Sequence, residues 1–351
     1  MEGLSNPLLN AQILGLLPPD KRSDPALIRV LYLGTATYDL PLFREKQTGR
    51  FVDRGCRVSW LDVADAARHV DVAACARSIE AADVILVGGG NTLFAVDRFF
   101  DTGLVPHLQA AMERGCVLAG GSAGAICWFE SGHSDSADPD SYRVPMLAKF
   151  GGESAAAAKD ERSEYDQADK KEWKYLRCPG LGFVPGPLVC CPHHDKIQSN
   201  GVLRAHDFDG MLLARARANS RSALGLGIDH YAAFIVEGER YRVYALPDKP
   251  GSVATEGGTG GGAAFDVGED GTPNGVPGVW IKRVLVDPDA GANTDGELFV
   301  EAMVCPPSGM LADILAYGGD NLPDQNDSEK DENQRAVDNC RKENPSGRQL
   351  L

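Results

Sequence analysis

The sequence predicts an α/β fold of the doubly wound type, in which helices flank a mostly parallel sheet. Short, continuous apolar runs such as residues 28–34 and 84–87 are typical of parallel strands that are buried on both faces. These runs alternate along the chain with stretches of helical spacing. Two later apolar runs, 232–236 and 240–245, are joined by a short polar turn and predict an antiparallel hairpin in the C-terminal part.

The same patterns place the individual elements in order. They predict strands at 28–34, 57–61, 84–87 and 116–119, helices at 63–81, 93–100, 105–113 and 125–130, and a helix or loop at 39–51. Further on, residues 279–286 predict a last strand, and residues 298–304 predict another strand or a short helix.

The composition changes at several points along the chain and indicates its organisation. We expect an N-terminal extension at 1–26 that packs loosely and a single α/β domain at 27–310. This domain carries a charged insertion at 149–177 and a very Gly-rich insertion at 247–278. Residues 311–351 are polar and predict a disordered tail.

The bulk properties exclude several classes of partner. A formal net charge of -15 argues against nucleic acid or an anionic membrane as a partner. The N-terminus lacks the basic start and apolar run of a secretory signal, and no apolar stretch reaches the ~18 residues of a membrane span. The nine cysteines include no CxxC pair. We therefore expect a cytoplasmic protein in a reducing compartment.

The stretch from Cys116 to Asp135 contains the strongest signal for chemistry. An apolar run is followed by Gly120-Gly121-Ser122-Ala123-Gly124, which matches the G-x-S-x-G nucleophile elbow, and then by a predicted helix. Such a turn exposes a serine hydroxyl at the carboxyl end of a sheet, beside the N–H groups of a helix. A Gly-rich turn without chemistry is the alternative.

A second glycine loop, from Gly88 to Thr92, follows the strand predicted at 84–87. Its spacing fits neither a dinucleotide fingerprint nor a phosphate-binding loop. Bare N–H groups at the end of a strand nevertheless suit an oxyanion hole, to which Gly89 or Gly90 contributes one donor and Ala123 the other. A tight turn with no catalytic role remains open.

The run from Cys190 to Asp195 contains the adjacent histidines His193 and His194. Neighbouring residues of an extended segment point to opposite sides, so the two rarely bind one metal ion. A general base is the better interpretation for one of them, and a loop histidine without a catalytic role is the alternative. We expect no metal and no other cofactor.

Taken together, these blocks resemble the peptidase E and cyanophycinase group of serine peptidases, family S51. The resemblance rests on the Gly88 loop, on the Ser122 elbow with its continuation to Glu130, on residues 191–195 and on Leu226 to Asp229. It implies a flavodoxin-like fold, similar to that of class I glutamine amidotransferases, with serine in place of cysteine at the elbow. It also implies Ser122 as nucleophile, His193 as base and Asn91 as a substrate-binding residue.

The resemblance places the third member of the triad, a Glu, Asp or Asn in the family, just before the hairpin, where this chain reads Asp229-His230. Asp229 is chemically the better partner, since a carboxylate stabilises the imidazolium that forms during catalysis. His230 and Asp135 are the alternatives. Arg204 is a candidate cation for recognising an N-terminal aspartate.

The resemblance therefore predicts a serine exopeptidase of small peptides, such as Asp-X dipeptides, that works through an acyl-enzyme. A cyanophycinase-like activity on β-linked Asp-Arg units and a non-hydrolytic binding or sensor protein are the alternatives. An esterase of the α/β-hydrolase type is disfavoured, because that fold places its acid before the histidine. The expected partner is a small peptide, with no nucleic acid or membrane and with a homodimer left open.

Overall fold

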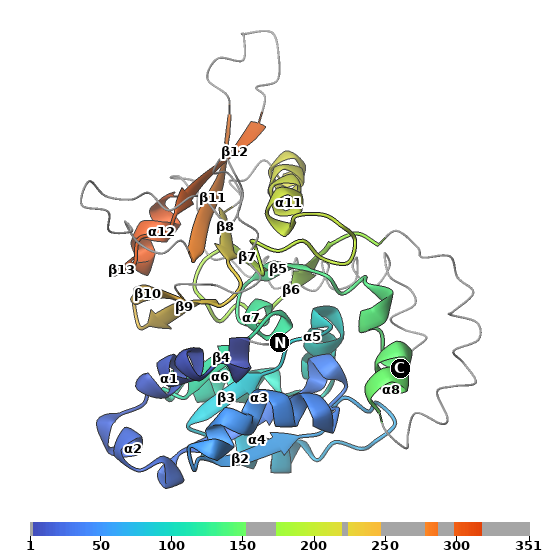
Figure 1. Cartoon of the computed structure of the whole chain (residues 1–351), viewed down its shortest axis with the longest axis vertical. Coiled ribbons are helices and arrows are strands. Elements are labelled where there is room, and N and C mark those ends of the chain that lie inside the picture. The colour runs from blue at the N-terminus through green and yellow to red at the C-terminus, as the bar shows by residue number, and fades with distance from the viewer. Residues whose placement is uncertain (1–2, 152–172, 220–223, 247–277, 287–297, 318–351) are drawn as a thin grey trace. The chain divides into compact units, whose positions relative to one another are not determined.

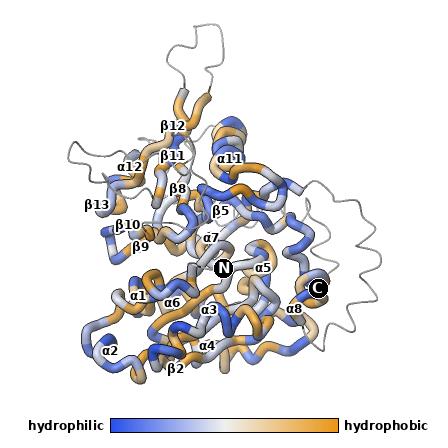
Figure 2. The backbone as a smooth tube through the Cα atoms, viewed as in Figure 1, coloured by the Kyte–Doolittle hydropathy of each residue, from blue (hydrophilic) through white to orange (hydrophobic). Residues whose placement is uncertain are grey.

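The computed structural model describes residues 3–151, 173–219, 224–246, 278–286 and 298–317. The chain forms two compact units where the sequence predicts one domain. The described part of the first unit comprises residues 3–128, 134–151 and 173–183. The second takes residues 129–133 and the described residues from 184 to 317. Apolar and polar stretches alternate along both units (Figure 2).

The first unit is built on a parallel sheet whose strand order is β2-β1-β3-β4 (Figure 1). Its strands are β1 (Arg29–Leu33), β2 (Arg57–Leu61), β3 (Val84–Val87) and β4 (Val117–Gly120). In the register of β3 and β4, Val87 lies opposite Gly120, so the two carboxyl ends lie side by side. The segments that follow them, the Gly88 loop and the Ser122 elbow, therefore begin at the same edge of the sheet.

Helices and short turns complete this unit. They are η1 (Gly3–Ser5), α1 (Pro7–Gly15), α2 (Pro19–Ser23), η2 (Pro25–Leu27), η3 (Thr35–Thr37), α3 (Pro41–Asp53), α4 (Val72–Ala81), α5 (Thr92–Asp101), α6 (Val105–Glu113), α7 (Ala123–Ile126), η4 (Pro139–Ser141) and α8 (Arg143–Phe150), together with strand β6 (Leu176–Pro179). Strand β3 is fully buried, as its continuous apolar run predicts.

The N-terminal segment packs into the core, which differs from the loose extension expected at 1–26. Leu4, Leu14 and Leu17 are buried in one cluster with Tyr32 and Phe51. Burying such a leucine contributes about 1.5–3 kcal/mol, so these residues belong to the stable part of the unit. The composition of the segment gave no sign of this, because its apolar residues are interrupted by prolines.

The second unit contains a sheet in which the order β12-β11-β8-β7-β5 combines parallel and antiparallel pairs. Its strands are β5 (Ser131–Ser134), β7 (Leu188–Pro192), β8 (Leu224–Ile228), β11 (Val279–Val286) and β12 (Leu298–Val304). Strands β5, β7 and β8 pair in parallel, while β11 and β12 are antiparallel additions. Helix α11 (Arg204–Asn219) packs on this sheet through Phe208 and Leu212.

The hairpin predicted from the sequence is present in this unit. It consists of β9 (Ala232–Glu237) and β10 (Arg240–Ala245), with β13 (Ser308–Met310) added to β10. The turn between the two strands contains Gly238 at φ 60°, a left-handed conformation that glycine adopts readily. The fold class predicted from the sequence, a parallel α/β sheet with an antiparallel hairpin, is thereby confirmed.

Several predicted boundaries differ from the structure. The helix expected at 63–81 begins only at Val72, because the side chain of Asp71 accepts a hydrogen bond from Ala74 N–H and caps α4. The helix expected at 125–130 is the short α7, and strand β5 follows it. Residues 311–317 form helix α12 (Leu311–Tyr317) where a disordered tail was expected. Most of the expected insertions and residues 318–351 lie outside the described residues.

No helix in the described ranges has both the length and the apolar character needed to cross a bilayer.

Candidate active site

Ser122 lies at the tip of a strand–turn–helix unit made of β4 and α7. Its backbone has φ 55° and ψ −117°, a conformation that non-glycine residues rarely adopt. Strain of this kind is typical of a nucleophile elbow, which turns the side chain out of the sheet edge. The half-buried hydroxyl of Ser122 has no hydrogen-bond partner within the described residues of the first unit.

Two glycines allow this turn to close. A Cβ at Gly120 would lie 2.2 Å from the carbonyl oxygen of Gly124, and a Cβ at Gly124 would lie 2.2 Å from that of Val87. Both neighbours are backbone atoms, which cannot move aside as a side chain would. The close approach therefore brings the start of α7 against the end of β3, where the Gly88 loop begins.

The Gly88 loop is held in place by the chain around it. Gly90 has φ 141°, and a Cβ there would lie 2.2 Å from the carbonyl oxygen of Ala36. Among the described residues, the N–H groups of Gly89, Gly90 and Ala123 make no hydrogen bond with another group. Backbone donors that have no partner in the protein are available to a bound anion or oxyanion.

Asn91 shapes this loop through its side chain. Its Oδ1 accepts a hydrogen bond from Phe94 N–H at 3.0 Å and caps α5. Its Nδ2 donates to the carbonyl oxygen of Ser136 at 3.1 Å and to Ser141 Oγ at 3.0 Å. Since both amide hydrogens already have acceptors, this geometry supports a structural role for Asn91 more than the expected role in substrate binding.

His193 lies in the second unit, directly after β7. Pro192 at the end of β7 is opposite Ile228 at the end of β8, so the residues that follow these parallel strands meet at one edge. Nδ1 of His193 lies 2.9 Å from Nδ1 of His230, and one nitrogen donates to the other. The His193 ring is half-buried, and this contact leaves its Nε2 for a second partner.

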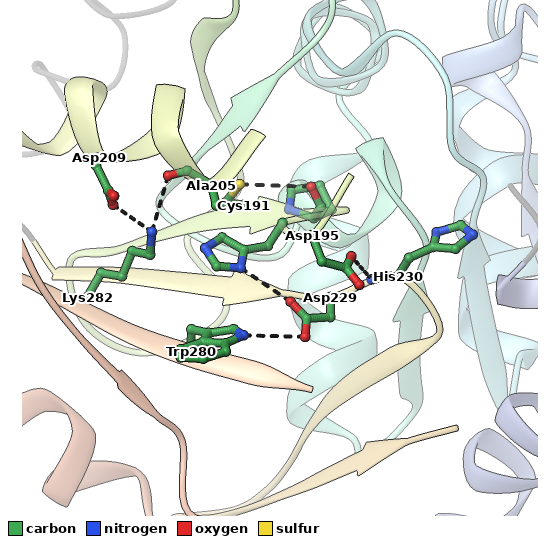
Figure 3. Close-up of polar contacts among 10 residues, drawn as sticks. Cys191, Asp195, Ala205, Asp209, Asp229, His230, Trp280 and Lys282 are labelled. Atoms are coloured by element: carbon green, nitrogen blue, oxygen red, sulfur yellow. Dashed lines mark hydrogen bonds and ion pairs between the residues drawn. The ribbon is translucent and has the colours of Figure 1, made fainter. Parts of the chain in front are cut away.

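Asp229, the expected partner of His193, binds a different histidine. The Nδ1–H of His194 donates to its Oδ1 at 3.2 Å, and the indole N–H of Trp280 donates to its Oδ2 at 3.3 Å (Figure 3). Figure 3 shows the His230 ring extending away from this carboxylate. His230, which follows Asp229 in the sequence, is thus the residue that contacts His193.

The protein lowers the pKa of His193 well below its ordinary value of 6.5. Burial is the main cause, because desolvation disfavours the charged imidazolium. The positive charge of Arg204 and the neighbouring ring of His230 act in the same direction. The imidazole of His193 is therefore neutral at pH 7 and able to accept a proton.

The two remaining candidates from the sequence, Arg204 and Asp135, have hydrogen-bond partners of their own. The guanidinium of Arg204 is fully buried and donates to the carbonyl oxygen of His133 at 2.5 Å, so the proposal that it binds substrate loses its support. Asp135 lies in the first unit after β5, where its carbonyl oxygen accepts a hydrogen bond from Asp138 N–H.

Sequence reasoning missed the residues that support the contact between His193 and His230. His194 and Asp195 were part of the recognised motif, but nothing in the pattern assigned them separate roles. Trp280 lies in the apolar strand predicted at 279–286, and no signal in the sequence links it to Asp229, which is 51 residues away. No group of three or more His, Cys, Asp or Glu residues in the described part of the chain is arranged to hold a metal ion.

A parallel α/β sheet with a strained serine between a strand and a helix defines the class of α/β proteins that carry a nucleophile elbow. Residues 21–244 match the profile of Peptidase family S51. The chain belongs to this family, which confirms the resemblance predicted from its motifs, and all candidate site residues lie within the matched range.

Two curated proteins show similarity to the chain. One, named G2/mitotic-specific cyclin-1, from Trypanosoma brucei brucei, is 29% identical over 239 residues, covering 65% of this chain and 66% of that protein. The other, named Uncharacterized peptidase YgaJ, from Bacillus subtilis (strain 168), is 54% identical over 57 residues. That match covers 16% of this chain and 25% of the relative. The chain thus spans less than two thirds of the length of each relative.

Solved structures of two proteins are also similar. One is a candidate peptidase E protein from Listeria monocytogenes EGD-e, with 16% identity and a TM-score of 0.42, covering 69% of this chain and 94% of that one. The other is a peptidase from an acI-B1 Actinobacterium, with 16% identity and a TM-score of 0.41, covering 66% and 84%.

Proposed function

We propose that this chain is a serine exopeptidase of small peptides, in which Ser122 is the nucleophile and His193 is the general base. The observation that carries the proposal is the backbone of Ser122, whose strained turn lies beside the Gly88 loop and leaves the N–H of Ala123 without an acceptor among the described residues. Membership of Peptidase family S51 supports the same reaction class.

In the proposed reaction, His193 Nε2 takes the proton of Ser122 as its Oγ attacks the carbonyl carbon of the scissile peptide bond. The N–H groups of Ala123 and of Gly89 or Gly90 stabilise the oxyanion that forms. The imidazolium then protonates the leaving amine, and water hydrolyses the acyl-enzyme by the reverse use of the same groups. The lowered pKa of His193 supports its role as base, because the ring is neutral before the reaction.

We propose His230 as the residue that orients His193. The contact of 2.9 Å between their Nδ1 atoms is the one that an orienting partner makes in a triad, and it leaves Nε2 for the nucleophile. A neutral imidazole holds the ring but gives less electrostatic support to an imidazolium than a carboxylate does. A Ser-His-His arrangement is therefore expected to be slower than one with an acid in the third position.

The experiment combines an active-site probe with a substrate screen. A fluorophosphonate should label the wild-type protein at Ser122, and Ser122→Ala and His193→Ala should each abolish labelling. Ser78→Ala supplies a matched control, because Ser78 lies on α4 and its hydroxyl, within the part of the chain that the structure describes, donates to the carbonyl oxygen of Ala74. In the reaction itself, Ser122→Ala should lower kcat by a factor on the order of 10⁶.

The screen uses Asp-X dipeptides, β-linked Asp-Arg and other N-terminal dipeptides, and it separates the peptidase E-like from the cyanophycinase-like alternative. A folded wild-type protein that neither reacts with the probe nor cleaves any of these peptides would contradict the proposal and favour a non-hydrolytic binding protein. Labelling at a residue other than Ser122 would equally contradict it.

A further inference from the structure

Besides the contact between His193 and His230, at least three hydrogen bonds join the two chain segments that carry these histidines. The N–H of His194 donates to the carbonyl oxygen of Ile228 at 3.1 Å, and the N–H of His230 donates to Asp195 Oδ1 at 2.7 Å. The third bond is the one from His194 Nδ1 to Asp229. Residues 193–195 and 228–230 therefore form one cross-linked unit, and the contact between His193 and His230 is its outer end.

The backbone at His193 explains why neighbouring rings have different environments. His193 has φ 52°, a left-handed conformation that reverses the chain direction directly after β7. The ring of His193 is half-buried, whereas His194 is fully buried. Gly227 makes room for the buried ring, since a Cβ there would lie 2.6 Å from His194 Cδ2. The His194 ring thus packs against Gly227 of β8, and from this position its Nδ1 reaches Asp229.

Asp229 connects this unit to the next strand of the sheet. Its side chain is fully buried, and its two oxygens are bound by His194 and by Trp280 of β11. Its N–H donates to the carbonyl oxygen of Gly278, which precedes β11. A buried carboxylate that loses a donor is costly, so each of these contacts restrains where Asp229, and with it the adjacent His230, can lie.

We propose that Asp229 is a positioning residue for the reaction: by bridging His194 and Trp280, it holds His230 at the distance from which His230 orients the base His193. This inference rests on the proposed function. It assigns to Asp229 no contact with substrate and no proton transfer, and it adds Trp280 and His194 to the residues on which the reaction depends. A displacement of about 1 Å in such a base costs about 10²-fold in rate.

The test uses two variants that each weaken the bridge from His194 through Asp229 to Trp280. Asp229→Asn keeps the size of the side chain but removes its charge, and Trp280→Phe removes only the indole N–H. Asp209→Asn is the matched control, because Asp209 binds the buried Lys282, which lies on β11 as Trp280 does, at 2.6 Å. Among the described residues, Asp209 makes no hydrogen bond with His193 or His230. All three variants are expected to lose stability, and only the first two should affect the reaction.

With the substrate that the wild-type protein cleaves fastest, Asp229→Asn and Trp280→Phe should lower kcat by about 10²-fold while KM stays within about twofold. Asp209→Asn should leave kcat unchanged. Each kcat is divided by the folded fraction, which is measured by circular dichroism. The proposal is overturned if Asp229→Asn and Trp280→Phe, each corrected for its folded fraction, both keep the kcat of Asp209→Asn.

A second measurement does not depend on activity. Selective labelling of the seven histidines allows the His193 ring signal to be followed by NMR as the pH is changed. The midpoint of the His193 titration should move in Asp229→Asn and in Trp280→Phe, because the contact with His230 is altered, and it should not move in Asp209→Asn. An unchanged midpoint in both bridge variants overturns the positioning role. If the wild-type protein hydrolyses nothing, the proposed function fails and this titration alone decides the inference.

Discussion

Among the described residues, Ser122 and His193 are two of five non-glycine residues with positive φ. Ser122 follows β4 after one glycine, and His193 directly follows β7, a strand that pairs in parallel with β5 and β8. This conformation costs free energy at each position, and it persists because the surrounding packing leaves no alternative. At Ser122 the restraint is the close approach of Gly124 to β3, and at His193 it is the burial of the next ring, His194. The strain turns each side chain out of its sheet edge.

Asp39 has no part in the proposed mechanism, and its buried carboxyl leads to a prediction about stability. Burial raises the pKa of its carboxyl from 3.8 to about 6, although Oδ2 accepts hydrogen bonds of 2.6 Å from the N–H groups of Val63 and Ala64. Its φ of 57° is tolerated by asparagine as well as by aspartate. Asp39→Asn can therefore retain the backbone while removing the charge.

The sign of the effect follows from the raised pKa. Between pH 3.8 and about 6 the folded protein keeps the proton that the unfolded chain has lost, so the contribution of Asp39 to stability is present at low pH and is lost as the pH rises. The free energy of unfolding of Asp39→Asn, relative to wild type, should therefore increase by about 2–3 kcal/mol between pH 4 and pH 7.

Urea denaturation at a series of pH values measures this difference. Asp53→Asn serves as the control, because the Asp53 side chain is 65% exposed on α3 and remains in water in both states. A difference between Asp39→Asn and wild type that is flat across this range would show that the carboxyl is not held in a desolvating environment.

At the scale of elements, the packing of α7 against β3 decides whether the elbow can form. Gly124→Ala places a methyl group 2.2 Å from the carbonyl oxygen of Val87 and 3.0 Å from that of Gly88, so strand and helix must separate. We expect a loss of about 3 kcal/mol or more in the free energy of unfolding, together with loss of probe labelling at Ser122.

Gly210→Ala is the matched control for this prediction. Gly210 lies exposed in the middle of α11, and a Cβ there meets nothing within 4 Å. Alanine favours a helix over glycine, so this variant should gain about 1 kcal/mol. Chemical denaturation measures both variants, and equal stabilities for Gly124→Ala and wild type would exclude the tight contact between α7 and β3.

At the scale of the whole molecule, the chain crosses between its two units more than once. Residues 129–133 belong to the second unit, whereas the segments on either side of them belong to the first. This short segment pairs with β7 through Ser131 and Gly132, and it also supplies Glu130, which binds Arg215 at 3.0 Å. The second unit therefore depends on a strand that arrives from within the sequence of the first.

The separate fragments 1–183 and 184–351 test this dependence. Fragment 184–351 lacks residues 129–133, so the fully buried guanidinium of Arg204 loses His133 as a partner. A buried charge that loses its partner typically costs about 3–5 kcal/mol, enough to unfold a domain of this size. We expect no cooperative unfolding transition from this fragment alone, and recovery of one when both fragments are produced together.

Urea titrations followed by circular dichroism measure these transitions, with the intact chain as the reference. A cooperative transition from fragment 184–351 alone would show that β5 is dispensable.

The amino-acid sequence predicts those elements whose signal is local. The apolar run of β3, the glycines of the elbow and the turn of the hairpin each specify a conformation through neighbouring residues, so the fold class and the family could be predicted. The ends of α4 and α7 and the packing of Leu4, Leu14 and Leu17 could not, because capping and burial depend on the chain around them.

The residue that contacts His193 follows from long-range packing in the second unit. Asp229 and His230 are adjacent, and their chemistry favours the carboxylate as the partner of a base. Which side chain faces His193 depends on the register of β7 with β8 and on Trp280, which takes one oxygen of Asp229 from a strand 51 residues further along the chain. Contacts over such separations are set by the packing of the whole unit, and no local pattern of residues encodes them.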